Sequence, residues 1–257
     1  MISQLLHETD GKAGIATITL NRPERRNALN RALVEELKES LTRAGEDERL
    51  RVVAVRGSGP DFCAGADLRE LQEAVQAGPE ASLEDAQALG DLFLLIRRLE
   101  KPVVALVHGR ALAGGAGLAT ACDLVLAAAD AQFGYPEVQL GFVPAMVMAI
   151  LRRAVGEKRA FELITLGHSI DAETASRYGL VNRVFPAADF DRECEAFLAD
   201  LGTRSASALA LSKRLLYQID GASFESAVRA GAQVNVIARL TEDCQEGVRR
   251  FLDRSSD

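Results

Sequence analysis

The fold is decided by the stretch KPVVALVHGRALAGGAGLATACDLVLAAADAQFGYPEVQLGFVP, residues 101–144. Residues 103–107 form a continuous β-branched apolar run, which is typical of a strand buried on both faces. Residues 113–117 (AGGAG) carry almost no side-chain bulk, so another molecule can contact the backbone there. Residues 118–122 then predict a short helix, whose first N–H groups lack intrahelical acceptors and carry the positive end of its dipole. This stretch therefore predicts a binding place for an anionic or partly anionic oxygen.

A carboxylate follows the second apolar strand, which is predicted over residues 123–129. Glu137 stands on a glycine- and proline-containing loop among Phe133, Tyr135 and Val138. Apolar neighbours desolvate a carboxylate, which raises its pKa and suits it to proton transfer near neutral pH. The plain alternatives are a tight turn and a solvated loop glutamate, so spacing alone does not assign catalysis.

The same pattern occurs earlier in the chain. VVAVRG (residues 52–57) and VVALVHG (residues 103–109) are each followed, a few residues later, by Ala-Gly. These dipeptides are Ala64-Gly65 and Ala113-Gly114. A repeat of strand, small-residue turn and helix predicts a layered core in which two N–H-rich turns lie side by side.

Composition restricts the class of protein. The chain has 257 residues, of which 48% are apolar and 26% charged, as in an ordinary globular protein of one large domain or one domain with an appendage. A net charge of −7 argues against a nucleic-acid partner.

Residues 1–14 lack the basic start and apolar run of a signal peptide, and no apolar run reaches the roughly 18 residues of a membrane span. We therefore expect a cytoplasmic protein with no membrane partner.

The cysteines show neither a metal-ligand spacing nor a compact disulfide framework. They are widely separated, at Cys63, Cys122, Cys194 and Cys244. We expect reduced thiols and no metal site.

The other elements follow from periodicity and turn chemistry. Residues 15–20 alternate as a strand does, and Asn30 is a predicted N-cap for a helix to about residue 44. Residues 72–84 mix glycine, proline and serine with charges, which predicts a mobile surface excursion next to the site. Further helices are predicted at residues 85–99, 145–155, 157–166 and 171–178, and strands at 51–55 and 181–185.

Beyond Pro186 the chain predicts amphipathic helices at residues 189–201, 205–219, 224–240 and 246–252. Their surplus apolar residues favour packing on another subunit and hence a homo-oligomer. The plain alternative is a helical cap on the chain's own core.

In this order and spacing the motifs resemble the crotonase, or enoyl-CoA hydratase/isomerase, superfamily. The resemblance rests on residues 21–23 (NRP) with 27–29 (NAL), 62–68 (FCAGADL), 101–123, 133–137 (FGYPE) and 179–181 (GLV). It implies an α/β fold with a spiral core of ββα repeats, residues 1–186. It also implies a C-terminal helical region, residues 187–257, that forms a homotrimer or a hexamer.

The resemblance also implies an acyl-CoA thioester as substrate, with no cofactor apart from the coenzyme A that the substrate carries. The thioester oxygen would accept hydrogen bonds from the backbone N–H groups of Ala66 and Gly114, each worth roughly 3 kcal/mol to an enolate. Glu137 would be the acid and base. The implied substrate contacts are Arg25, Arg26, Ala28, Ala64, Gly65, Asp67 and Leu68. The two arginines would meet phosphates, or would simply be solvated.

One departure from the family pattern bears on the reaction. Hydratases of this family hold a water between two glutamates, and the first of these positions is Gly117 here. One carboxylate suffices to move a proton between the α and γ carbons, whereas hydration normally needs a second group to orient the water. We therefore expect isomerisation of 3-enoyl-CoA to 2-enoyl-CoA. Hydration stays open if a fixed water substitutes, or one of Tyr135, Glu70, Glu73 and His108.

After Pro144 the family's glycine-rich turn is replaced by AMVM, residues 145–148, which predicts a bulkier and more apolar pocket wall.

Other functions were also weighed against the sequence. A dinucleotide turn at Gly115 and Gly117 lacks its third glycine, since Thr120 stands there. No G-x-S-x-G hydrolase motif occurs. Coenzyme A binding with little catalysis, thioester hydrolysis and decarboxylation stay open, and the sequence does not indicate the acyl-chain length.

Overall fold

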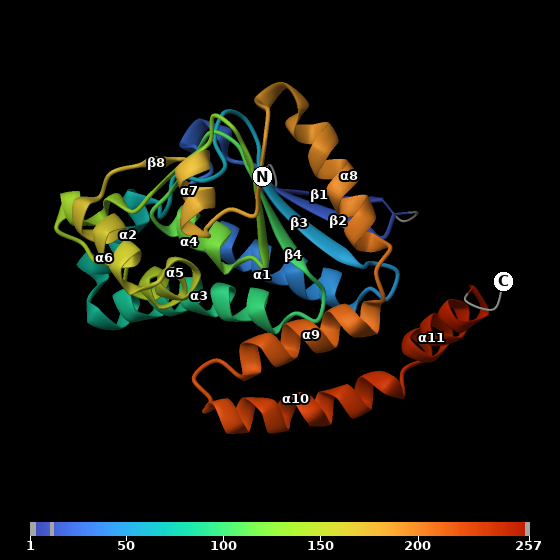
Figure 1. Ribbon diagram of the computed structural model, residues 1–257. Coiled ribbons are helices and arrows are strands. Elements are labelled where there is room, and N and C mark those ends of the chain that lie inside the picture. The colour runs from blue at the N-terminus through green and yellow to red at the C-terminus, as the bar shows by residue number, and fades with distance from the viewer. Residues whose placement is uncertain (1–3, 11–12, 255–257) are drawn as a thin grey trace.

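The computed structural model describes residues 4–10 and 13–254, and its centre is a six-stranded sheet with the order β1-β2-β3-β4-β6-β9 (Figure 1). These strands are β1 Leu5–Asp10, β2 Ile15–Leu20, β3 Val52–Gly57, β4 Val103–Val107, β6 Leu124–Ala128 and β9 Arg183–Phe185. β1 pairs antiparallel with β2, and the other neighbours pair in parallel. A three-stranded sheet is formed by β5 Arg110–Leu112, β7 Gln132–Gly134 and β8 Ile170–Asp171.

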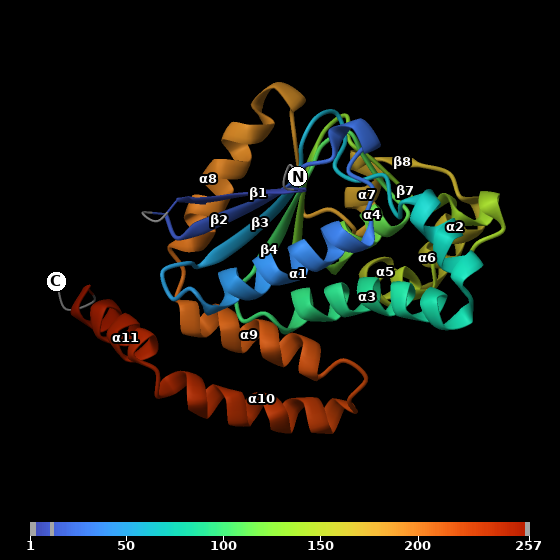
Figure 2. The ribbon, with the colours of Figure 1, turned by 180° about the vertical axis from the view of Figure 1, so that it is seen from behind.

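The two faces of the large sheet are covered by different helices because successive strand residues point to opposite sides. Val53 and Val55 pack in the cluster that contains α1 Arg31–Glu46 and α3 Pro79–Arg98, whereas Val52 and Ala54 pack against α8 Phe190–Gly202. Figure 2 shows α1 and α3 together on one side of the strands and α8 on the other. The buried interior of the sheet explains why β3 and β4 are apolar without alternation.

The helix that follows the first predicted strand begins where expected. The Asn30 side chain accepts a hydrogen bond of 2.9 Å from the Leu33 N–H and so caps α1. The predicted helices at 145–155, 157–166 and 171–178 are confirmed as α5 Ala145–Val155, α6 Glu157–Leu166 and α7 Ala172–Tyr178. Short 3₁₀ helices lie at η1 Pro23–Arg25, η2 Pro136–Leu140 and η3 Ala187–Asp189.

The prediction of a mobile excursion over residues 72–84 is wrong. This segment belongs to α2 Leu68–Ala77 and to the first turns of α3. Asp67 caps α2 by accepting from the Arg69 N–H, and Pro79 is the first residue of α3, where its missing N–H costs no hydrogen bond. Gly78 joins the helices with φ +114°, a conformation that suits glycine. Gly78 and Pro79 therefore mark a junction between two helices, and the residues on either side of them are helical.

β1 was not predicted, because it gives a weak sequence signal. Along this edge strand only Leu5 is buried, so no alternating pattern develops. Residues 1–3 and 11–12, which were part of the expectation about the N-terminal stretch, lie outside the described residues.

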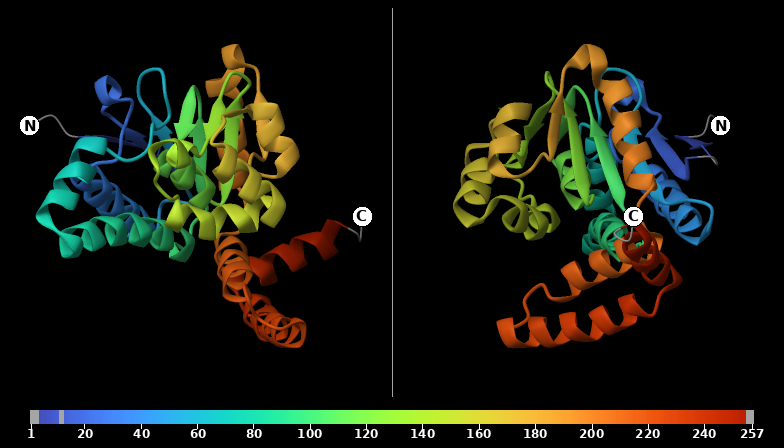
Figure 3. Two further views of the ribbon diagram at one scale, coloured as in Figure 1. Left: turned by 90° about the vertical axis from the view of Figure 1, so that its left-hand side faces the viewer. Right: turned by 45° about the vertical axis from the view of Figure 1, so that its right-hand side comes forward.

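The C-terminal helices extend away from the sheet. α9 Ala206–Gln218 and α10 Phe224–Arg239 lie side by side, and α11 Glu242–Arg254 follows them (Figure 3). Large exposed apolar side chains, among them Phe224, Leu240 and Phe251, are spread over α10 and α11 and the loop between them. The domain division at residue 186 and the packing on another subunit stay predictions. In the part of the chain that the structure describes, no helix combines the length and apolar character needed to cross a bilayer.

A buried ion pair fastens α9 to the sheet. The Lys213 ammonium group, in a residue only 8% exposed, donates to Asp123 Oδ2 at 2.6 Å and to the carbonyl oxygens of Ile96 and Lys101. Asp123 also accepts from the Tyr217 hydroxyl and the Val103 N–H. Burial lowers the pKa of Lys213, while Asp123 opposes that shift. The pair connects α9 with the starts of β4 and β6.

We expect Lys213→Met to lower the free energy of unfolding by about 3–5 kcal/mol, because it leaves Asp123 as a nearly buried carboxylate without its cation. Arg204→Met is the matched control. It removes an exposed ion pair with Asp200 on the chain surface and should cost less than about 1 kcal/mol. Urea unfolding measures both variants, and equal losses would contradict the anchoring role of Lys213.

Candidate active site

A cavity of about 440 Å³ opens between the two small-residue turns, η2 and the start of α5. Most of the predicted site residues line it, namely Arg25, Ala28, Ala64, Ala66, Asp67, Leu68, Gly114 and Glu137. Arg26 and Gly65 do not line it. Folding thus brings together residues from four separate segments of the chain. The roles assigned to them stay predictions.

The two turns lie against each other, as the repeat predicted. A Cβ atom on Gly65 would lie 2.8 Å from the Ala113 Cβ, and one on Gly115 would lie 2.3 Å from the Cys63 carbonyl oxygen. Backbone hydrogen bonds hold this contact on both sides: the Leu29 N–H donates to Gly65 O, and the Leu112 N–H donates to Cys63 O. Glycine is therefore required at both positions, because any side chain would separate the turns.

Two backbone donors are left unused beside this contact. α4 Gly114–Ala121 begins at Gly114, four residues earlier than the sequence predicted, so the Gly114 N–H is the first of the helix and has no intrahelical acceptor. Among the described residues, the N–H groups of Ala66 and Gly114 donate to no protein acceptor. A Cβ on Gly114 would lie only 3.7 Å from the Ala66 nitrogen, so the two donors are neighbours. Such a pair can hold the oxygen of a thioester.

Backbone strain marks the same place. Ala113, the N-cap of α4, has φ +50° and ψ −124°, which is unusual for a residue with a side chain. Its N–H donates to Gly134 O in the neighbouring β7. The surrounding hydrogen bonds hold this conformation, and strained backbone of this kind concentrates at functional sites.

Glu137 is the buried carboxylate of this cavity. It is the second residue of η2 and only 7% exposed. Its Oε2 atom is buried and forms no hydrogen bond within the described part of the chain. Burial raises the pKa of Glu137 above its ordinary value. The side chain therefore binds a proton more readily than an exposed glutamate does, which suits it to take up and release one.

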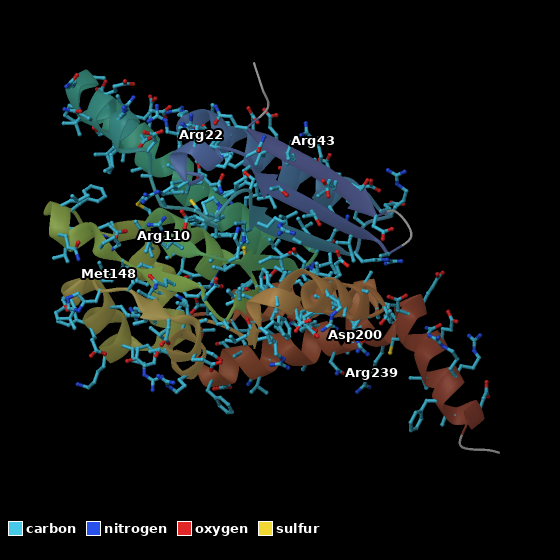
Figure 4. The ribbon with its side chains drawn as sticks, turned by 90° about the horizontal axis from the view of Figure 1, so that it is seen from above. Arg22, Arg43, Arg110, Met148, Asp200 and Arg239 are labelled. Atoms are coloured by element: carbon cyan, nitrogen blue, oxygen red, sulfur yellow. The ribbon has the colours of Figure 1, made fainter. Side chains whose placement is uncertain are left out.

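The other carboxylate on the cavity wall is engaged. Asp67 Oδ2 lies 3.0 Å from an Arg22 guanidinium nitrogen, and Asp67 Oδ1 accepts from the Arg69 N–H (Figure 4, where Arg22 is labelled). Asp67 thus connects the loop that contains Arg22 to the start of α2. This connection also positions the turn that contains Gly65.

None of the four side chains considered as substitutes for a second glutamate lines the cavity. The Tyr135 hydroxyl is buried and pairs with Thr120 Oγ1 at 3.1 Å, and burial raises its pKa. Glu70 accepts from the Arg31 N–H, Glu73 is exposed on α2, and His108 Nε2 lies 2.9 Å from Gly59 O. Hydrogen bonds to other elements thus hold Tyr135, Glu70 and His108 away from the cavity, and Glu73 faces solvent.

Sequence reasoning assigned no role to two groups that hold the turns. Asn27 is fully buried with φ +54°, and its Nδ2 donates to Ser58 O and Asp61 O, both at 2.8 Å. Arg110 binds both carboxylate oxygens of Asp61 at 2.8 Å (Figure 4), and although burial acts in the other direction, these bonds hold the pKa of Asp61 below its usual value. The sequence signal for Asn27 was an asparagine shortly after Pro23, because asparagine is favoured in turns and tolerates the left-handed conformation.

The far wall of the cavity is apolar. Ala145, Met146 and Val147 line it, as the AMVM segment predicted, whereas Met148 does not. Leu71, Leu89, Leu140, Phe142 and Val143 complete this wall and were not predicted. A Cβ on Gly117 would lie 2.5 Å from Val147 Cγ2, so a side chain at position 117 has no room.

Comparison with known proteins agrees with this geometry. The family model described as enoyl-CoA hydratase/isomerase matches residues 10–256. The chain is 36% identical over 242 residues to the 2,3-dehydroadipyl-CoA hydratase of Escherichia coli, covering 93% of this chain and 92% of that protein. It is 32% identical over 249 residues to the rat mitochondrial enoyl-CoA hydratase domain-containing protein 3, covering 97% and 82%.

Among solved structures, that of an enoyl-CoA hydratase of Mycobacterium smegmatis superposes with a TM-score of 0.93 at 35% identity, covering 98% of this chain and 97% of that one. The α/β architecture with C-terminal helices is thus the crotonase fold that the motifs predicted. With the family model spanning almost the whole chain and relatives above 30% identity along its length, this protein belongs to the enoyl-CoA hydratase/isomerase family.

Proposed function

We propose that this enzyme isomerises 3-enoyl-CoA to 2-enoyl-CoA, with Glu137 as its single acid and base and no cofactor beyond the coenzyme A of the substrate. The observation that carries the proposal is one buried carboxylate, with its Oε2 atom unpaired among the described residues, in the same cavity as two unused backbone donors. Arg25, exposed at the cavity rim, is suited to meet a phosphate group of coenzyme A.

The reaction needs only one proton carrier. The thioester oxygen accepts hydrogen bonds from Ala66 and Gly114. Glu137 then removes a proton from C2, the C2–H electron pair enters the conjugated system, and a dienolate forms with its charge on that oxygen. The same carboxyl group returns the proton to C4, so that a C4–H bond forms and the double bond lies between C2 and C3. Atoms and charges balance without another reactant.

Hydration of 2-enoyl-CoA is the second candidate, because relatives such as the E. coli and M. smegmatis proteins are named as hydratases. It would require a water oriented without a second available carboxylate, because Asp67, the other carboxylate on the cavity wall, is paired with Arg22. Incubation with 3-enoyl-CoA and 2-enoyl-CoA of several chain lengths, followed by absorbance of the conjugated thioester and by product mass, separates the candidates. Gain of absorbance without added mass supports isomerisation, and one added water supports hydration. Silence with both substrates would favour a different thioester reaction or coenzyme A binding alone.

Gly114 allows one donor to be removed in isolation. Replacing Gly114 with glycolic acid turns the Ala113–Gly114 amide into an ester and removes only the N–H. Proline would not do so, because Ala113, with φ +50° and ψ −124°, lies outside the backbone region open to a residue before proline. A Cβ at Gly114 would lie 3.5 Å from Leu89 Cδ2, an ordinary contact. We expect the ester variant to lower kcat about 10²- to 10³-fold. Gly114→Ala keeps the N–H and should lose far less. Steady-state kinetics of the pair decide, and equal losses would remove this N–H from the mechanism.

Glu137→Gln should abolish turnover while acyl-CoA affinity changes only a few-fold, because shape and hydrogen bonding at the oxygen site are kept. In the wild type, kcat/KM should rise with pH and level off above a pKa higher than the ordinary 4.5, because burial raises the pKa of the base. A pH–rate profile checks the second expectation. Full activity of Glu137→Gln would exclude this carboxylate as the acid and base.

The same substitution should leave the fold at least as stable. A carboxyl group with a raised pKa binds its proton more tightly in the folded state, so the wild type loses stability as pH rises from the ordinary value of 4.5 toward neutrality. Glutamine has no such loss. The Tm difference between Glu137→Gln and wild type should therefore grow with pH in thermal melts, and a variant of lower Tm at neutral pH would contradict the burial argument.

A further inference from the structure

Gly117 lies one helical turn beyond Gly114 on α4, so the two positions share a face of the helix. At position 117 the space is already filled. A Cβ there would lie 2.5 Å from Val147 Cγ2 and 3.0 Å from Phe93 Cζ. Val147 and Phe93 are 3% and 4% exposed and come from α5 and α3. Because a β-branched side chain in a helix is stiff about χ1, Val147 cannot move aside cheaply.

This contact gives the reacting end of the cavity a hydrocarbon wall. Val147 lines the cavity, and its neighbours on the lining include Leu71, Leu89 and Met146. None of these side chains donates or accepts a hydrogen bond in the usual sense. An ordered water needs two to four polar partners. This wall therefore offers a water beside Glu137 no polar partner. The other charged side chains on the lining are Arg25, Arg69 and Asp67, and Asp67 is paired with Arg22.

We propose that Val147, backed by Phe93, is the specificity-determining residue of this site: it fills the volume beside α4 and keeps water away from Glu137. The inference rests on the proposed isomerisation and deepens it. The proton that Glu137 takes from C2 is returned to C4 of the same molecule before it exchanges with solvent. The C2–H bond breaks and the C4–H bond forms with no net uptake of a solvent proton. The wall thus decides whether the enzyme transfers a proton or adds water.

The first experiment follows isomerisation of 3-enoyl-CoA in D₂O at early conversion, with deuterium at C4 of the product read by mass spectrometry and NMR. Val147→Thr keeps the shape of valine and adds a hydroxyl group. One hydrogen bond to a water is worth up to a roughly tenfold change, so we expect the labelled fraction and the hydration-to-isomerisation ratio to rise by about five- to tenfold. The wild type should give mainly unlabelled product.

The matched control is Val155→Thr. Val155 is also buried on α5 but does not line the cavity, so its hydroxyl should leave the labelled fraction unchanged. Isomerisation by the wild type with equal labelling in Val147→Thr would overturn this inference alone. An efficient hydratase activity of the wild type would overturn it as well. Absence of isomerisation in the wild type would instead overturn the proposed function, and the proton-return step with it.

A second experiment tests the filled volume without using activity. Gly117→Ser should lower the Tm, because its side chain meets Val147 Cγ2, and Val147→Ala should recover much of that loss in the double variant, since it removes the contacting methyl group. Thermal melts of the two single variants and the double variant form the cycle. A Gly117→Ser protein as stable as the wild type, or purely additive losses, would show that position 117 is not closed by Val147 and would overturn the inference.

Discussion

The site depends on the close contact between two backbone turns. Gly65 and Gly115 let the turn after β3 lie against the turn before α4, because a side chain at either glycine would overlap Ala113 or the Cys63 carbonyl. The parallel pairing of β3 with β4 brings the ends of these strands to the same edge of the sheet. The Ala66 and Gly114 N–H groups become neighbours as a result. The position of the two donors is here a consequence of the close packing at two glycines.

Around this contact, several polar side chains form hydrogen bonds that hold the turns, whereas Glu137 does not. Asp67 is bound to Arg22, Asp61 to Arg110, and Asn27 to the carbonyl oxygens of the first turn. Each of these side chains is thereby held in place, as a rigid scaffold requires. Glu137 differs from them, since its Oε2 atom is buried without a partner in the region described. An unsatisfied carboxylate costs stability, and such costs are tolerated where a group reacts.

Local sequence signals succeeded where one interaction dominates. Asn30 capped α1 as predicted, and the continuous apolar runs became β3, β4 and β6 because a sheet covered on both faces needs them. Local signals failed to predict elements that are stabilised mainly by contacts with other parts of the chain. β1 buries only Leu5 and is held by pairing with β2, and the segment around Gly78 became a helix junction instead of a loop.

The family and the crotonase fold could be predicted from the amino-acid sequence, because glycines, strand runs and one carboxylate in fixed order leave few other arrangements. The roles of Ala66, Gly114 and Glu137 stay predictions. The sequence also showed that Gly117 carries no carboxylate. The sequence could not predict that Tyr135, Glu70, Glu73 and His108 lie away from the cavity, or that Val147 occupies the space at Gly117. Side-chain contacts between α3, α4 and α5 depend on helix packing across distant segments, which no local pattern encodes.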